Sequence, residues 1–109
     1  EQETSDTPTR AMLMLNMVTT EELLDDAEYQ DIMEDVRSEC ERHGTVTSVY
    51  IPRPDGTDAE PQGVGRVYVQ FEHTPQCEAA LRAIAGRQFD GRTVICAYVR
   101  DEAWPRAAA

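Results

Sequence analysis

Strand-like and helix-like segments alternate along this chain in the order strand, helix, strand, and the same order is then repeated. The strand-like runs carry alternating or continuous apolar residues, whereas the helix-like segments place apolar residues three and four positions apart. The strand-like runs are 12–17, 45–51, 65–71 and 93–99, and the helix-like segments are 21–44 and 74–86. Two strand–helix–strand units in a row predict an α+β fold of the ferredoxin-like kind (βαββαβ), a sandwich of one four-stranded antiparallel sheet and two helices on one face.

The first helical segment has one apolar side. At about 100° of turn per residue, Ile32, Met33, Val36 and Cys40 fall within roughly 60° of Tyr29. A stripe of this width is what a helix needs in order to pack against a sheet. We therefore expect these five side chains to contact the core.

An acidic stripe lies beside the apolar one. Glu28, Asp31, Asp35 and Glu39 fall at about 200° to 280° on the same helical wheel, and like charges four residues apart repel one another. Folding gains nothing from this repulsion, so the stripe is interpreted as a surface for a cationic partner. The alternative, which the helix by itself does not exclude, is the solvated face of an acidic protein.

Capping residues mark the ends of the helical segments. Thr20 and Asp26 each suit the N-cap of the first helix, so its start stays open between them. Gly44 suits the position that ends this helix. Thr74 followed by Pro75 predicts the start of the second helix, which ends at a glycine.

The chain has 109 residues, which suits a single domain. We expect a flexible segment at 1–10, the folded domain at 11–100 and a tail at 101–109. The formal net charge is −11, and all ten cations are arginine. Such a surface repels nucleic acid over most of its area and favours basic partners. The longest apolar run, 11–18, is too short to cross a membrane, so no membrane association is expected.

Three cysteines, Cys40, Cys77 and Cys96, lie far apart, each within an apolar pattern. No CxxC pair and no cysteine–histidine cluster accompanies them, which argues against a zinc site or a disulfide framework. We expect buried, reduced thiols and hence a reducing compartment. The sequence also lacks a recognisable arrangement of catalytic groups, so it predicts neither an enzyme nor a bound metal or cofactor.

The third strand-like run resembles a signature of RNA-recognition motifs, in which aromatic residues on the sheet stack on RNA bases. Here Val64 stands at the basic opening position and Arg66 at the first stacking position, while Tyr68 keeps an aromatic. On the first strand, Leu13 occupies the place where that family usually has another aromatic. Base–aromatic stacking contributes about 1–3 kcal/mol per base. Because most of the stacking positions are lost, we expect weak or no RNA binding.

A protein-binding subfamily of RNA-recognition motifs, the UHM domains of splicing factors, combines an acidic first helix with an Arg-x-Phe triplet between the second helix and the fourth strand. The chain has Gly86-Arg87-Gln88-Phe89 at that place, together with the acidic helix and the missing stacking residues. This combination resembles a UHM domain over 11–99. The resemblance implies a nuclear module of pre-mRNA splicing that binds tryptophan-containing basic peptide motifs during 3′ splice site recognition.

In UHM domains, a tryptophan of the partner enters a slot between the acidic helix and the Arg-x-Phe loop. By position, Phe89 would stack on the incoming indole, and Arg87 would brace it while pairing with a helix carboxylate. The carboxylates that would receive the cations of the ligand are Asp31, Asp35, Glu39 and, extending the stripe, Glu28. Without the family context, Phe89 would be interpreted as a core residue and Arg87 as a surface cation.

The resemblance also implies partners, namely the tryptophan motifs of a branch-point-binding splicing factor, of the large U2 snRNP subunit, or of both. A full-length protein of this kind would in addition bind polypyrimidine RNA. Two other functions stay open, which are RNA binding through Tyr68 and nearby arginines, and self-association. Trp104 lies in a polar C-terminal segment and is expected to pack that segment onto the domain. The alternative is that it enters the tryptophan slot of a neighbouring copy.

Overall fold

The computed structural model describes residues 3–53, 65–89 and 91–105. Most of the predicted loop at 52–63, Val64 of the strand signature and the end of the C-terminal tail lie outside these residues. In chain order the elements are β1 (Thr4–Ser5), β2 (Ala11–Leu15), α1 (Thr20–Leu24), α2 (Asp26–Glu41), β3 (Val46–Tyr50), β4 (Arg66–Phe71), α3 (Thr74–Ile84), β5 (Gln88–Phe89), β6 (Arg92–Thr93), β7 (Ile95–Val99) and a 3-10 turn, η1 (Asp101–Ala103).

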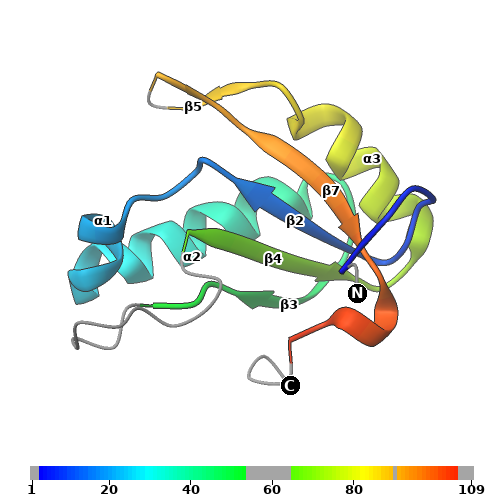
Figure 1. Cartoon of the computed structure of the whole chain (residues 1–109), viewed down its shortest axis with the longest axis horizontal. Helices are drawn as coiled ribbons and strands as arrows, with labels where there is room; N and C mark the ends of the chain where they lie inside the picture. Colours follow the sequence, from blue (N-terminus) through cyan, green and yellow to red (C-terminus); the bar gives the residue numbers. More distant parts are fainter. Residues whose placement is uncertain (1–2, 54–64, 90, 106–109) are drawn as a thin grey trace.

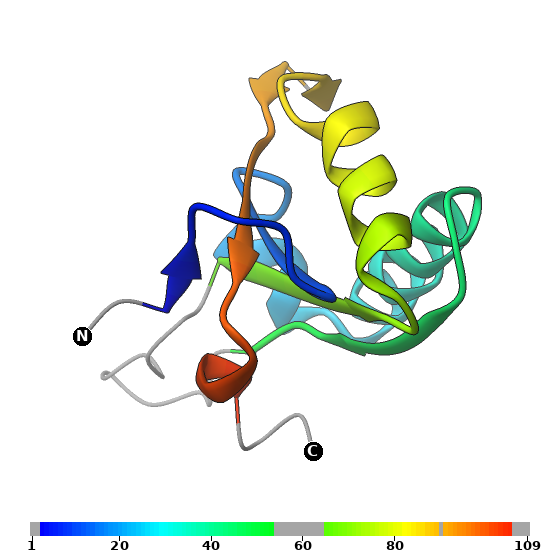
Figure 2. The ribbon, with the colours of Figure 1, turned by 90° about the vertical axis from the view of Figure 1, so that its right-hand side faces the viewer.

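The main sheet is antiparallel, with strand order β1-β7-β2-β4-β3, and α2 and α3 both lie on one of its faces (Figures 1 and 2). The predicted α+β, ferredoxin-like sandwich is confirmed. The sheet has five strands rather than four because Thr4–Ser5 pairs with the outer edge of β7. A separate two-stranded sheet, β5–β6, connects α3 to β7.

The main core lies between the sheet and the helices. Phe71, Met12 and Met14 of the sheet are almost fully buried there, and Val36 and Cys40 of α2 pack against the same cluster. The remaining members of the predicted apolar stripe, which are Tyr29, Ile32 and Met33, are partly buried against this core. The apolar side of the first helical segment is therefore confirmed. Fully burying one such side chain contributes about 1.5–3 kcal/mol, which orients α2 with its acidic stripe outward.

The first helical segment is two helices rather than one. Thr19 caps α1 in a capping box, because its Oγ1 accepts the Glu22 N–H at 3.2 Å and its own N–H donates to Glu22 Oε1 at 2.9 Å. Asp25 then adopts an extended backbone and caps α2, with its Oδ1 accepting the Glu28 N–H at 3.0 Å. The predicted N-caps, Thr20 and Asp26, were each one residue too late. Two strong N-caps six residues apart divide the segment.

Gly44 stands near the end of α2 for a reason other than the predicted one. It is not among the glycines with positive φ, so the left-handed turn expected of a helix-ending glycine is absent there. A Cβ at this position would instead overlap the side chain of Gln76 on α3. The Gln76 Oε1 also accepts the His73 N–H at 3.0 Å, so the N-cap of α3 is His73 and not the predicted Thr74.

The second face of the sheet is covered by the ends of the described chain. Tyr68 of β4 is 5% exposed, and the Trp104 ring lies edge-on to it with the ring centroids 6.0 Å apart. The Tyr50 ring stacks on Tyr68, also with the centroids 6.0 Å apart. The Tyr68 hydroxyl donates to the Glu3 carboxylate at 3.0 Å, and Glu3 also pairs with Arg66. The prediction that Trp104 packs the C-terminal segment onto the domain is confirmed.

The cysteines are free thiols, as predicted. Cys40 and Cys77 are buried in the main core, and Cys96 is half-buried against it. Burial raises the pKa of Cys40 and of Cys77 to about 12, and that of Cys96 to about 11. The thiols are therefore unreactive packing groups at neutral pH.

Candidate functional site

A groove of about 410 Å³ runs between α2 and the β5–β6 hairpin. This volume lies at the lower end of the range for ligand pockets. Its apolar lining comes from the loop after β2, from α2, from the end of α3, from β5 and from the residue before β7. The residues are Met17, Val18, Ile32, Val36, Ile84, Phe89 and Val94. Its polar lining consists of Glu22, Asp35, Ser38, Glu39, Arg42, Arg87 and Gln88. The groove therefore offers an apolar floor between charged walls.

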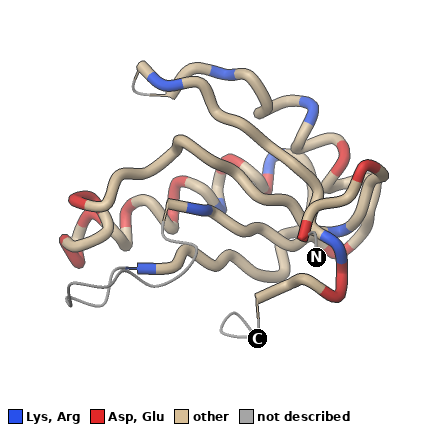
Figure 3. Tube along the Cα trace, viewed as in Figure 1, with Lys and Arg blue, Asp and Glu red and all other residues tan. Residues whose placement is uncertain are grey.

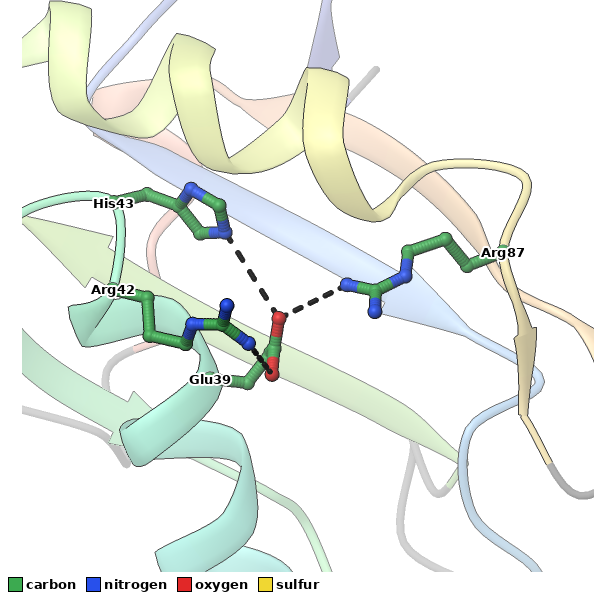
Figure 4. Close-up of polar contacts among 4 residues, drawn as sticks. All are labelled: Glu39, Arg42, His43 and Arg87. Carbon is green, nitrogen blue, oxygen red and sulfur yellow. Dashed lines mark hydrogen bonds and ion pairs between the residues drawn. The ribbon is translucent and has the colours of Figure 1, made fainter.

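Arg87 closes one side of the groove by pairing with Glu39. Its Nη1 donates to Glu39 Oε2 at 2.9 Å, joining the segment after α3 to the acidic stripe (Figure 4). This hydrogen bond holds the pKa of the Glu39 carboxyl below its ordinary value, against the opposite effect of partial burial. Glu39 therefore stays ionised near neutral pH, and it orients a guanidinium whose side chain is 54% exposed.

Two further cationic or titratable groups surround the same carboxylate. Arg42 Nη1 lies 3.5 Å from Glu39 Oε1, and His43 Nε2 lies 4.0 Å from Glu39 Oε2. Figure 4 shows Glu39 between these two side chains and Arg87. Within the acidic stripe, Glu39 is therefore the carboxylate with the most neighbouring cationic or titratable groups. It is already paired with arginines, so it is less available to a cationic ligand.

Phe89 is an aromatic side chain held at the surface. It belongs to the two-residue strand β5, which pairs with β6 in the register Gln88↔Thr93 and Phe89↔Arg92. The side chain is 44% exposed although it lines the groove, so it is not an ordinary core residue. The hairpin is entered through Gly86 at φ +85°, a left-handed conformation that favours glycine. This turn carries Phe89 out over the groove.

The predicted acidic stripe divides into two parts. Asp35 and Glu39 line the groove, whereas Glu28 and Asp31 are exposed on the same helix outside the lining. Figure 3 shows acidic positions along α1 and α2 and basic positions on the segment from the end of α3 through β6. The structure thus brings four of the six predicted site residues, Asp35, Glu39, Arg87 and Phe89, to one groove.

Several lining residues were missed by the sequence analysis. Ser38, Arg42 and Gln88 carry charge or hydrogen-bonding groups at the rim, and Glu22 reaches the groove from α1. Arg42 could have been found, because it stands three residues after Glu39 on the same helix. Glu22 could not, because its position depends on how α1 is capped and packed against α2.

Metal and membrane roles receive no support from the described residues. Among residues 3–53, 65–89 and 91–105, no group of three or more His, Cys, Asp or Glu side chains is placed to hold a metal ion. Within the same ranges, no helix combines the length and the apolar character that crossing a bilayer would require.

Solved structures show the same fold as this chain. The structure of the RRM3 domain of Gbp2 matches with a TM-score of 0.63 at 11% identity, covering 89% of this chain and 82% of that one. The structure of the RNA15 RRM matches with a TM-score of 0.56 at 16% identity, covering 88% and 95% respectively. The fold is therefore that of an RNA-recognition-motif-like domain.

Relatives in sequence carry this domain as a small part of longer proteins. The chain is 36% identical over 90 residues to a splicing factor U2af large subunit of Nicotiana plumbaginifolia, a match that covers 83% of the chain and 16% of that protein. It is 34% identical over 96 residues to a splicing factor U2af large subunit of Arabidopsis thaliana, a match that covers 88% of the chain and 16% of that protein.

A third relative is a protein of different activity, the serine/threonine-protein kinase Kist of Pongo abelii. The chain is 32% identical to it over 99 residues, which covers 91% of the chain and 22% of the kinase. A segment shared by splicing factors and a kinase is a module that can be joined to different proteins. The chain belongs to the family described as a domain of unknown function, DUF8489, whose model matches residues 3–104.

The likeness to the large U2af proteins agrees with short phrases in the sequence. Asn16-Met17-Val18, Glu21-Glu22-Leu23-Leu24-Asp25-Asp26, Glu34-Asp35-Val36-Arg37 and Ile51-Pro52-Arg53-Pro54 resemble the C-terminal domain of the large subunit of the U2 snRNP auxiliary factor. Two of these phrases form α1 and the middle of α2. Both helices contribute residues to the lining of the groove.

Proposed function

We propose that this domain is a peptide-recognition module of the UHM type, which binds basic linear motifs containing a tryptophan. One observation carries the proposal. The half-exposed Phe89, the Arg87 guanidinium held by Glu39, and the carboxylate of Asp35 all border a single groove with an apolar floor. In this proposal the indole of the ligand enters the groove and stacks on Phe89. Arg87 closes over it while Glu39 holds the guanidinium in place.

The indole supplies most of the affinity in this proposal. Burying a tryptophan side chain removes up to about 250 Å² from water, which corresponds to about 6 kcal/mol before ordering costs. The apolar floor formed by Val36, Ile84 and Val94 offers the surface against which this burial would occur.

The carboxylates supply orientation and preference for cations. An exposed ion pair contributes about 0–1 kcal/mol, so Asp35, Asp31 and Glu28 act mainly on encounter rate and specificity. Asp35 is the carboxylate best placed for the first cation of the ligand, because it lines the groove and is exposed. Glu39 also lines it but is shared with Arg42 and Arg87.

Calorimetry with a basic peptide containing one tryptophan tests the proposal. The wild-type chain should bind this peptide, and binding should be lost when alanine replaces the tryptophan of the peptide. Phe89→Ala should abolish binding, because it removes the stacking surface from a side chain that the fold leaves half exposed. Leu24→Ala is the matched control, since Leu24 is also exposed, at 55%, but does not line the groove. Equal binding by the Phe89→Ala chain would refute the proposal.

A second pair of variants tests the proposed role of the acidic stripe in binding the cations of the peptide. Asp35→Asn and Glu34→Gln remove one charge each from exposed positions on the same helix, and only Asp35 of the two lines the groove. Asp35→Asn should weaken peptide binding about three- to fivefold, and Glu34→Gln should change it by less than about twofold. Affinity should also fall as salt rises. An affinity that is flat in salt would remove the proposed role of the stripe.

RNA binding is the competing function, and titration with oligouridine separates the two. The face that binds RNA in RNA-recognition motifs is occupied here by Trp104, Tyr50 and Glu3 around Tyr68, which favours the groove instead. Sedimentation of the isolated domain tests self-association in the same way. Binding of oligouridine without binding of the tryptophan peptide would reverse the assignment.

We further propose that the whole protein acts in the nucleus during 3′ splice site recognition, as the splicing-factor names of its relatives suggest. The partners would be a branch-point-binding splicing factor, the large U2 snRNP subunit, or both, each presenting tryptophan motifs to this domain. Polypyrimidine RNA would be bound by other domains of the full-length protein.

A further inference from the structure

His43 lies beside the groove in a position that none of the roles above uses. It follows Arg42, the C-cap of α2, and its Nε2 is buried without a hydrogen-bond partner. The nearest acidic group is Glu39, whose Oε2 lies 4.0 Å away (Figure 4). That same oxygen accepts the hydrogen bond from Arg87 that closes the groove. A titratable ring therefore shares one carboxylate oxygen with the residue that braces the proposed ligand.

We propose that protonation of His43 draws Glu39 away from Arg87 and weakens binding of a cationic peptide, so that affinity falls as the pH drops below neutrality. This inference rests on the proposed peptide-binding function. Imidazole side chains are the groups that ordinarily gain charge between pH 5 and 8.

The surrounding charges decide the direction of the effect. His43 lies near Glu39 of α2, and the two other charged groups around that carboxylate are Arg42 at the end of α2 and Arg87 after α3. Gln76 of α3, which packs at the neighbouring Gly44, is uncharged.

Protonated Nε2 becomes a charged donor aimed at Glu39 Oε2 and competes with Arg87 for it. It also adds a third positive charge around one carboxylate. Both effects oppose a cationic ligand. The first weakens the hydrogen bond that holds Arg87 in place, and the second neutralises part of the negative charge of the acidic stripe.

The test is a pH series of calorimetric titrations. The probe is a basic peptide with one tryptophan and no histidine, blocked at both ends so that it does not itself titrate between about pH 6 and about pH 8. The wild-type affinity should fall about two- to fivefold across this range. His43→Gln keeps a hydrogen-bonding group but never becomes charged, so its affinity should not change with pH.

His73 provides the matched control, because the chain has two histidines. His73 is 67% exposed, lies before α3 and contacts Glu72 at 3.7 Å, away from the groove. His73→Gln should therefore keep the wild-type pH dependence. A wild-type affinity that is flat with pH, or an equal fall in the His43→Gln chain, would overturn the inference.

A second measurement needs no variant. If protonation weakens binding, then saturating peptide must shift the His43 titration midpoint to lower pH, because the coupling between the two events is reciprocal. Proton NMR of the two imidazoles should show this shift for His43 and not for His73. Binding with no such shift overturns the role of His43 and leaves the proposed function standing. Absence of binding at every pH overturns both.

Discussion

The guanidinium of Arg53 lies over the ring of Tyr29, 4.3 Å from its centroid. Arg53 Nε also donates to the backbone carbonyl of Leu23 at 2.8 Å, and the Tyr29 hydroxyl donates to the carbonyl of Ile51 at 2.9 Å. These contacts tie the end of α1, the start of α2 and the segment after β3 to one another. Because Glu22 of α1 lines the groove, the contacts of Arg53 and Tyr29 also help to hold this part of the groove in position.

Replacing this arginine by lysine should destabilise the domain. Arg53→Lys keeps the charge but loses the planar group that stacks on Tyr29 while donating to Leu23, at an expected cost of about 1–2 kcal/mol in the free energy of unfolding. The ion pair with Asp26 adds little, since that carboxylate is 91% exposed. Urea denaturation measures the change. Arg82→Lys, on an exposed pair with Glu78, is the control and should shift stability by less than about 0.5 kcal/mol.

Removing Trp104 should open the second face of the sheet. Trp104→Ala deletes the indole that packs edge-on against Tyr68, with an expected loss of about 1–2 kcal/mol in the free energy of unfolding. Trp104→Phe should lose less, because an aromatic ring remains over Tyr68. Denaturation of the three chains in parallel provides the comparison. Equal stability of all three would mean that η1 is not held by this contact.

The sequence predicted most of the fold because its signals were local and periodic. The apolar stripe through Val36 and Cys40 marked the buried side of α2, and the alternating runs marked the four long strands. The added strand at Thr4–Ser5 could not be predicted, because two polar residues show no alternation of apolar and polar side chains. Its place depends on pairing with Tyr98 and Val99, which lie near the other end of the chain.

The candidate site was predictable in part for a similar reason. Asp35 and Glu39 follow from helical spacing, and Arg87 and Phe89 follow from a family resemblance. The resemblance implied that Arg87 pairs with a helix carboxylate, and the structure shows that this carboxylate is Glu39. That Glu39 is the partner, and that His43 lies near it, was not predictable, because both depend on the distance between the end of α2 and the segment after α3. That distance is set by packing.

Gly44 should tolerate no side chain while Gln76 stays in place. A Cβ at position 44 would overlap the Gln76 side chain, so Gly44→Ala should cost about 1–3 kcal/mol in the free energy of unfolding. Gln76→Gly removes the obstructing atoms and should rescue part of the loss in the double variant. A double-mutant cycle from urea denaturation measures this coupling. Strictly additive losses would contradict the close approach of the two elements.

The buried thiols should make the domain less stable in alkali. Burial raises the pKa of Cys40 and Cys77 to about 12 in the folded chain, whereas a thiol in the unfolded chain ionises near its ordinary pKa of 9.0. Below that value both states hold the proton and pH has no effect through these groups. Above it the unfolded chain binds fewer protons than the folded one, so the free energy of unfolding falls as pH rises.

Urea denaturation between about pH 8 and about pH 9.5 measures this fall, in a range that ends below the ordinary tyrosine pKa of about 10. Cys77→Ala should show a shallower slope than the wild-type chain, although its stability at the lower pH is reduced by the cavity. In the folded wild-type chain, a thiol reagent at the lower pH should modify Cys40 and Cys77 at the rate of unfolding, because neither side chain is accessible. Immediate modification of these two cysteines would show that α2 and α3 open far more readily than their packing on the sheet implies.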